Sequence, residues 1–256
     1  MPASHAWARG AERPILLGHR GARHAAPENT IAAFELARRE GADGVELDVR
    51  LTADDAVVVL HDRTLARVSA GRDGRDVESL GQDELQRVDV GRGERAPALA
   101  DVLAWARAYG QRLNIELKRD VSRPRRLVRR CLELVAGHPD ASRTLVFSSF
   151  DPRLVALLAR GGPVPVAWLV HARQRGVGGA PGFRWLGAAG VHPEHSLVGS
   201  AFVERVHARG AFLGTWTVND PQEARRLARV GVDTVISDRP GALLQALQGG
   251  ARQARG

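Results

Sequence analysis

Short apolar runs alternate along the chain with segments of helical periodicity. The apolar runs that predict strands are residues 15–19, 45–51, 57–60, 112–118, 144–148, 164–170, 185–191, 211–218 and 234–237. Helical patterns lie between most of them, and the clearest are residues 30–39, 99–109, 123–136, 201–208 and 221–230. Strands that alternate with helices predict a parallel sheet. A total of roughly eight such strands favours a closed barrel over an open sheet.

One segment, residues 62–97, interrupts this alternation. It is rich in Gly, Arg and Asp, lacks a strong apolar run and has one weak helical pattern around Leu80 to Leu85. We interpret it as a small insertion after the second strand region. The prediction is therefore an α/β protein that forms a single (β/α)8 TIM-barrel domain over residues 1–256, with the insertion at about 62–97. The glycine-rich 170s give no pattern in which a helix can be placed.

Length and composition agree with this architecture. A chain of 256 residues with 44% hydrophobic residues is typical of one α/β barrel. No uncharged apolar run reaches membrane-spanning length, and residues 1–13 have no apolar signal core. The only cysteine, Cys131, excludes an internal disulfide. We therefore expect a cytoplasmic protein with no stable membrane insertion; the pattern does not address its oligomeric state.

The charge distribution narrows the class of partner. The formal net charge of +8 favours anionic ligands such as phosphates. Nucleic-acid binders usually add exposed aromatic side chains, whereas aromatics are only 5% here and the arginines are dispersed. We therefore expect a small-molecule partner and no nucleic acid. Lys118 is the only lysine among 37 basic residues, which indicates a position where arginine cannot replace a compact ammonium.

Polar residues gather where the predicted strands end, and active sites of barrels form at the carboxyl ends of the strands. These residues are His19, Arg20, Glu46, Asp48, His61, Glu116, Lys118, Trp216 and Asn219. Side chains two apart on a strand share a face, so Glu46 and Asp48 point the same way, while Leu47 points toward the helices. Buried charges must be paired or bind a metal. Three converging carboxylates favour a hard divalent ion, Mg²⁺ or Ca²⁺, over zinc.

Each group taken alone has a simpler interpretation. These are an exposed edge strand for Glu46–Asp48, a surface loop for His19–Arg20, a local turn for His61–Asp62 and a salt bridge between Glu116 and Lys118. The coincidence of all four groups with predicted strand ends favours a common site. We interpret the remaining histidines as surface or structural residues, although one of them, His192, also lies at a strand end.

Six segments, in this order and spacing, resemble the glycerophosphodiester phosphodiesterase family from about residue 15 to residue 247. They are Gly18-His19-Arg20-Gly21, Pro27-Glu28-Asn29-Thr30, Val45-Glu46-Leu47-Asp48-Val49, His61-Asp62-x-Thr64-Leu65, Ile115-Glu116-Leu117-Lys118 and Trp216-Thr217-Val218-Asn219. The resemblance implies a barrel that hydrolyses glycerophosphodiesters to glycerol 3-phosphate and an alcohol, with a place in lipid and glycerol metabolism.

The resemblance also implies a role for each matching residue. It assigns metal ligation to Glu46, Asp48 and Glu116, acid–base catalysis to His19 and His61, and phosphate contact to Arg20 and Lys118. The implied attacking group is the glycerol 2-hydroxyl, which gives a cyclic phosphate that water then opens. Trp216 has two interpretations, a substrate-binding contact to the glycerol or leaving group and a plain rim aromatic.

Two departures from the family pattern concern substrate preference. Arg67-Val68-Ser69 stands where the family often has Arg-Thr-Thr, and Pro97-Ala98-Leu99 where it often has Pro-Thr-Leu. Phospholipase-D-like relatives share the barrel and the His/Glu/Asp set and cleave head groups from lysophospholipids, so they are the alternative. Phosphatidylinositol-specific phospholipases match these segments less well. A protein that only binds anions would have no use for converging carboxylates.

Overall fold

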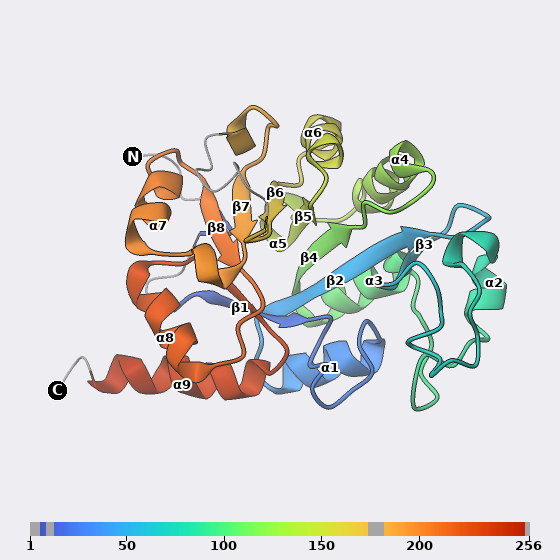
Figure 1. Ribbon diagram of the computed structural model, residues 1–256, viewed down its shortest axis with the longest axis horizontal. Coiled ribbons are helices and arrows are strands. Elements are labelled where there is room, and N and C mark those ends of the chain that lie inside the picture. The colour runs from blue at the N-terminus through green and yellow to red at the C-terminus, as the bar shows by residue number, and fades with distance from the viewer. Residues whose placement is uncertain (1–5, 9–12, 174–181, 254–256) are drawn as a thin grey trace.

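The structure is a computed structural model that describes residues 6–8, 13–173 and 182–253. Within these residues, eight parallel strands form a closed barrel (Figure 1). They are β1 (Ile15–His19), β2 (Gly44–Leu51), β4 (Arg112–Leu117), β5 (Leu145–Ser149), β6 (Val166–Val170), β7 (Gly190–Pro193), β8 (Phe212–Thr215) and β9 (Thr234–Ser237). The barrel closes because β1 pairs with β2 on one side and with β9 on the other. The predicted TIM-barrel fold is confirmed.

Helices cover the outside of the barrel between successive strands. The α-helices are α1 (Ile31–Arg39), α2 (Gln82–Leu85), α3 (Leu99–Tyr109), α4 (Pro124–Val135), α5 (Ala141–Thr144), α6 (Pro152–Gly161), α7 (Ser200–His207), α8 (Pro221–Val230) and α9 (Pro240–Gln253). Short 3₁₀ helices are η1 (Val77–Ser79), η2 (Gly182–Arg184) and η3 (His195–Leu197). None of the described helices is long and apolar enough to cross a membrane.

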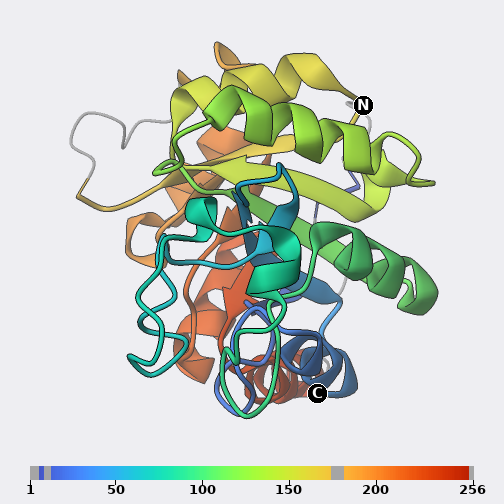
Figure 2. The ribbon, with the colours of Figure 1, turned by 90° about the vertical axis from the view of Figure 1, so that its right-hand side faces the viewer.

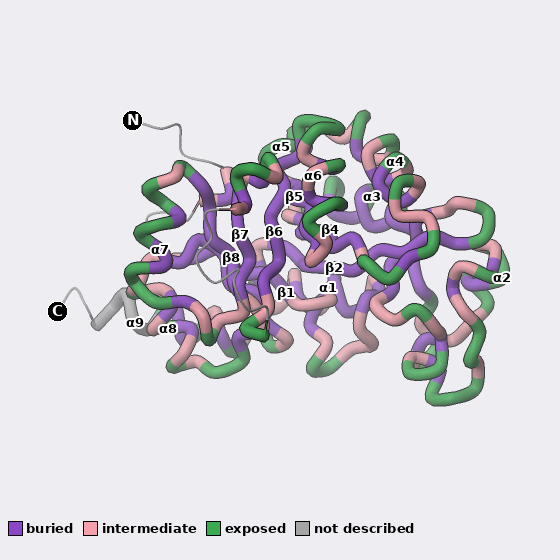
Figure 3. Tube along the Cα trace, turned by 45° about the horizontal axis from the view of Figure 1, so that its top comes forward, coloured by how far each residue is buried: buried purple, intermediate pink, exposed green. Residues whose placement is uncertain are grey.

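Alternation along the strands divides the core into two parts, and Figure 3 shows the strands buried inside a partly exposed shell. Leu47 and Leu117 belong to the large cluster that packs between the barrel and helices such as α1, α3 and α4. Leu17 and Ile236 belong to a smaller cluster inside the barrel, together with Trp7. Because neighbouring residues face opposite ways, the polar residues next to these outward leucines face the barrel interior.

The segment 62–97 lies to one side of the barrel, beside the end of β2, in Figure 1, and it faces the viewer in Figure 2. It follows the short strand β3 (Val57–Val59), which is antiparallel to β2. It contains η1 and α2, and the weak helical pattern around residues 80–85 corresponds to α2. A small cluster that includes Leu65, Leu80 and Leu85 gives the segment an apolar core of its own. Its first residues, which follow β3, reach the mouth of the barrel.

Several predicted strand boundaries were wrong, and the largest error is at residues 185–191. The strand there is Gly190–Pro193, and Trp185 is 86% exposed on the preceding turn. The apolar run misled because nearby residues such as Leu186 pack on the outer core without strand geometry. Thr144 ends α5 rather than beginning a strand, and β8 ends at Thr215. The unplaced part of the 170s, residues 174–181, lies outside the described residues.

Candidate active site

The candidate site lies at the carboxyl ends of the barrel strands and has two adjoining cavities. The inner cavity, of about 360 Å³, is lined by residues that include His19, Arg20 and Trp216. The outer cavity, of about 590 Å³, is lined by loops that follow β3, β4, β5 and β6. The two cavities share His61, Glu116, Lys118, Phe150 and His171. A molecule that extends through both cavities would therefore pass these shared residues.

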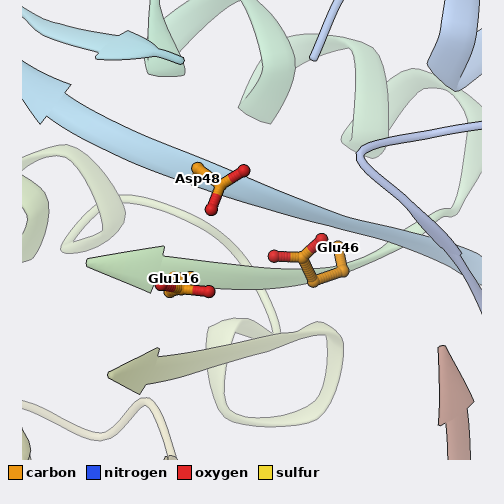
Figure 4. A group of neighbouring side chains, drawn as sticks. All are labelled: Glu46, Asp48 and Glu116. Carbon is orange, nitrogen blue, oxygen red and sulfur yellow. The ribbon is translucent and has the colours of Figure 1, made fainter. Parts of the chain in front are cut away.

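Strand register brings three carboxylates together at this junction (Figure 4). Asp48 on β2 is the register partner of Glu116 on β4, and Glu46 lies two residues before Asp48 on the same face. One carboxylate oxygen from each of the three lies within 4.8 Å of the others, and all three residues are buried. Carboxylate oxygens are the ligands that hard divalent ions prefer. The cluster can hold such an ion.

The electrostatics of the cluster fit a bound cation. Burial, together with the neighbouring Asp48 and Glu116, raises the pKa of Glu46 well above its usual value. Burial also raises the pKa of Glu116. Burial would raise the pKa of Asp48 too, but Lys118 and Arg20 outweigh it and hold that pKa below its usual range. Two cationic side chains therefore offset only part of the buried negative charge, and a divalent ion would offset the rest.

Lys118 and Arg20 occupy opposite sides of Asp48. The Lys118 Nζ atom lies 3.2 Å from Asp48 Oδ1 and 2.9 Å from Glu116 Oε1. The Arg20 Nε atom lies 3.1 Å from Asp48 Oδ2, and its Nη1 atom donates to Glu28 Oε1 at 2.9 Å. Among the described residues, none accepts a hydrogen bond from the Arg20 Nη2 atom. Both residues present positive charge at the edge of the carboxylate cluster.

The turn after β1 explains why His19 and Arg20 lie between two glycines. Arg20 has a φ of 56° and Gly21 a φ of 85°, both in the left-handed region. A Cβ atom at Gly21 would lie 2.5 Å from the backbone carbon of Ala33 in α1, a distance that real Cβ contacts essentially never show. The turn places the backbone N–H of Arg20 where it donates to Glu46 Oε2 at 3.1 Å. The glycine allows α1 to pack against the turn that holds Arg20.

Each of the two predicted catalytic histidines has a carboxylate on its Nδ1 atom. His19 Nδ1 lies 2.6 Å from Asp238 Oδ1, and His61 Nδ1 lies 2.6 Å from Asp62 Oδ1. A carboxylate at Nδ1 holds the proton there and leaves Nε2 as the exchanging nitrogen. The His19 Nε2 atom lies 3.9 Å from Glu46 Oε2, beside the carboxylate cluster. Burial lowers the pKa of His61, and Asp48 counters that effect only in part.

Aromatic side chains form one wall of the inner cavity. The Trp216 ring meets Phe150 edge-on with centroids 5.5 Å apart, and its Nε1 atom donates to the carbonyl oxygen of His192 at 2.8 Å. Trp216 is thus held in place and exposed to the cavity at the same time. His192 is fully buried, and burial lowers its pKa to about 3, which favours the neutral imidazole.

The structure adds partners to which the sequence argument gave no role. Asn29 donates from Nδ2 to Asp48 Oδ2 at 2.9 Å, which orients that carboxylate. Glu28 accepts from Arg20 and also from Arg67, which belongs to the segment 62–97. The matching Pro-Glu-Asn-Thr segment was a signal for the first two residues. Asp238 directly follows the last strand, so its place at a strand end was the signal for it.

Sequence and structure comparisons identify the family of the chain. The sequence profile of the glycerophosphoryl diester phosphodiesterase family matches residues 19–242. A glycerophosphodiester phosphodiesterase of Caldanaerobacter subterraneus is 29% identical, and the match covers 93% of this chain and 99% of that protein. The crystal structure of a Thermotoga maritima glycerophosphodiester phosphodiesterase has a TM-score of 0.74 at 29% identity, covering 91% of this chain and 97% of that one.

A further similar structure carries a ligand. It is an Oleispira antarctica phosphodiesterase in complex with the product sn-glycerol-3-phosphate. Its TM-score is 0.82 at 28% identity, and the superposition covers 92% of this chain and 97% of that one.

Proposed function

The chain belongs to the glycerophosphoryl diester phosphodiesterase family, and from this membership we propose a metal-dependent hydrolysis in which two histidines act as general acid and base. The products are glycerol 3-phosphate and an alcohol. The observation that carries the proposal is the junction of the two cavities, where three buried carboxylates lie beside His61 and Lys118. The glycerol 3-phosphate bound to the similar Oleispira antarctica phosphodiesterase supports the same product.

The proposed metal ligands are Glu46, Asp48 and Glu116, and the proposed ion is Mg²⁺ or Ca²⁺. All-oxygen ligation favours these two ions over zinc. A bound divalent ion supplies charge neutralisation at the non-bridging phosphate oxygens. Lys118 and Arg20 Nη2 bind the same oxygens from the protein side, because both present positive charge at the edge of the carboxylate cluster.

Each of the two cavities receives one half of the substrate, the glycerol moiety or the alcohol. The glycerol moiety is small and constant, which suits the inner cavity, where Trp216 packs against its carbon atoms. The alcohol varies and suits the larger outer cavity. The phosphorus atom then lies at the junction. His19 lines the inner cavity and therefore lies on the glycerol side of the phosphorus atom.

This placement gives each histidine a role. His19 lines the inner cavity but not the outer one. It removes the proton from the glycerol 2-hydroxyl as that oxygen attacks phosphorus. His61, which lines both cavities, donates a proton to the alcohol oxygen as the bond from phosphorus to that oxygen breaks. The anionic phosphate beside His61 favours its protonated form in the complex. Water then opens the cyclic phosphate with the roles reversed, which returns both histidines to their starting states.

Product analysis tests the reaction. Incubation with glycerophosphocholine is expected to release choline and glycerol 3-phosphate, and EDTA is expected to abolish the release until Mg²⁺ or Ca²⁺ is restored. Lysophosphatidylcholine serves as the second arm, since a phospholipase-D-like enzyme would release choline from it in preference. Phosphocholine among the products, or turnover that ignores EDTA, would contradict the proposed chemistry.

The charge-conserving change Lys118→Arg is expected to lower kcat/KM by about tenfold or more, which is about 1.4 kcal/mol of transition-state stabilisation. The ammonium lies within 3.2 Å of both Asp48 and Glu116, and a planar guanidinium is too large for that position. Steady-state kinetics on glycerophosphocholine measure the loss. The reverse exchange Arg107→Lys, on the exposed side of α3, is the matched control. Unchanged kinetics in Lys118→Arg would show that the lone lysine reflects composition only.

A further inference from the structure

The outer cavity has an unequal balance of charge. Its lining includes five basic side chains, Arg50, Arg63, Lys118, Arg119 and Arg173, and three acidic ones, Asp62, Glu116 and Asp120. Under the function proposed above, this cavity receives the leaving alcohol. Its charge should therefore decide which alcohols the enzyme accepts.

Every acidic side chain in that lining already has a cationic partner. Asp120 pairs with Arg50 at 2.8 Å, and Glu116 pairs with Lys118 at 2.9 Å. Asp62 pairs with Arg67 at 2.5 Å and also holds His61. A cationic alcohol would therefore compete with an existing cationic partner at each of these carboxylates.

Some of the basic side chains that line the outer cavity form no ion pair with a described carboxylate. Arg63 pairs with Asp76 at 2.6 Å. Arg119 and Arg173 are exposed, and neither forms an ion pair with any described residue. Arg119 directly follows Lys118, and Arg173 lies two residues after His171, so both extend from loops that reach the junction. Within the described part of the chain, the outer cavity therefore has two guanidinium groups without a carboxylate partner, beyond the residues that bind the phosphodiester.

The small number of aromatic side chains in the lining of the outer cavity also disfavours a cationic alcohol. Quaternary ammonium groups are typically bound by cages of aromatic rings. Phe150 is the only Phe, Tyr or Trp that lines the outer cavity among the described residues, and Trp216 lines the inner cavity instead. A choline group there would meet one ring and two unpaired arginines, which repel it.

We propose that the outer cavity selects glycerophosphodiesters whose alcohol carries a second anionic group, a phosphate or a carboxylate, and that Arg119 and Arg173 bind this group. The inference rests on the proposed function. Guanidinium groups match phosphate and carboxylate oxygens in a bidentate geometry, which gives orientation as well as charge. Both arginines are exposed, so the contribution of each is modest and depends on salt.

Two probes that differ by one phosphate test the inference. Glycerophosphoinositol 4-phosphate and glycerophosphoinositol share the ring, and glycerophosphocholine supplies a cationic alcohol. The kcat/KM for the phosphorylated probe is expected to exceed that for the neutral probe by about tenfold at low salt, and the ratio is expected to fall as NaCl is raised. Glycerophosphocholine is expected to be the poorest of the three substrates.

The variants Arg119→Gln and Arg173→Gln, alone and combined, assign the effect to residues. The double variant is expected to bring the ratio of the two inositol probes to about one, while kcat/KM for the neutral probe stays within about twofold. Arg107→Gln on α3 is the matched control and should leave the ratio at its original value. A ratio near one in the unchanged protein, or a ratio that survives in the double variant, would overturn the inference. Hydrolysis of none of the three probes would instead overturn the proposed function itself.

Discussion

Glu46→Gln, Asp48→Asn and Glu116→Gln are each expected to lower kcat/KM by about 10²- to 10⁴-fold, because a bound metal ion supplies several kcal/mol of transition-state stabilisation. The three carboxylates form a single cluster within 4.8 Å, so loss of any one weakens the whole set of ligands. The measurements are steady-state kinetics on glycerophosphocholine and calorimetric titration with Mg²⁺ and with Ca²⁺. Each variant should bind both ions more weakly than the unchanged protein.

Stability of the metal-free protein should change in the opposite direction. Burial, with Asp48 and Glu116 nearby, raises the pKa of Glu46 above its unfolded value. A carboxyl group with a raised pKa contributes stability below its unfolded pKa, and that stability is lost as pH rises through the folded pKa. At neutral pH, which lies above the unfolded pKa, this raised pKa makes the Glu46 carboxyl oppose folding. Glu46→Gln removes the ionisable group, so its Tm without metal should equal or exceed that of the unchanged protein.

The control for this set is Glu204→Gln, which makes the same chemical change on the exposed side of α7. It should alter neither turnover nor metal affinity. If the three site variants kept their activity in EDTA, the cluster would have no part in catalysis. If Glu46→Gln instead lowered the Tm of the metal-free protein, the carboxylate would be a structural group of the barrel.

His61→Ala is expected to reduce kcat/KM on glycerophosphocholine by about 10²- to 10⁴-fold, the usual contribution of a general acid. Choline leaves as a poor alkoxide unless its oxygen is protonated, whereas p-nitrophenolate leaves without help. The loss should therefore be far smaller with the p-nitrophenyl ester of glycerol 3-phosphate. Kinetics on both substrates measure the contrast.

His19→Ala should behave differently, because a general base acts on the attacking hydroxyl whatever group leaves. Its loss of kcat/KM should be of similar size on both substrates. The double variant should be little worse than the single ones on glycerophosphocholine, since residues that act as one unit are not additive. His138→Ala, in the segment between α4 and α5, is the matched control. The opposite pattern would exchange the two roles, and substantial activity of both single variants on both substrates would exclude the pair from catalysis.

Local rules were sufficient for much of this site. The two-residue period placed Glu46 and Asp48 on one face of a strand, and the outward packing of Leu47 agrees with it. The same rule applies to β4, where Leu117 packs outward and the neighbouring Glu116 faces the interior. The preference of threonine for N-cap positions explains the start of α1, where the Thr30 side chain accepts from the Ala33 N–H. These features depend on neighbours in the chain, so the sequence shows them directly.

The strand boundaries predicted from the sequence were wrong where apolar residues occur in a turn as well as in a strand. Residues 185–189 read as a strand because they are apolar, yet the strand begins at Gly190. A Cβ atom at Gly190 would lie 2.5 Å from the Phe212 ring, so that position depends on packing against β8. Contacts of this kind involve residues far apart in the chain, so the hydrophobicity of a short sequence segment does not predict them.

The sequence by itself determined the fold class, the carboxylate and histidine set and their place at strand ends, because periodicity and short motifs are local properties. Only the tertiary structure decided which groups meet. Asp238 reaches His19 across 219 positions because β9 closes the barrel against β1. Arg67 reaches Glu28 because the segment 62–97 folds back toward the barrel mouth. Arg119 and Arg173 come to one cavity because β4, β5 and β6 are successive strands of the barrel. Barrel closure and strand register set these distances, and both arise from the packing of the whole chain.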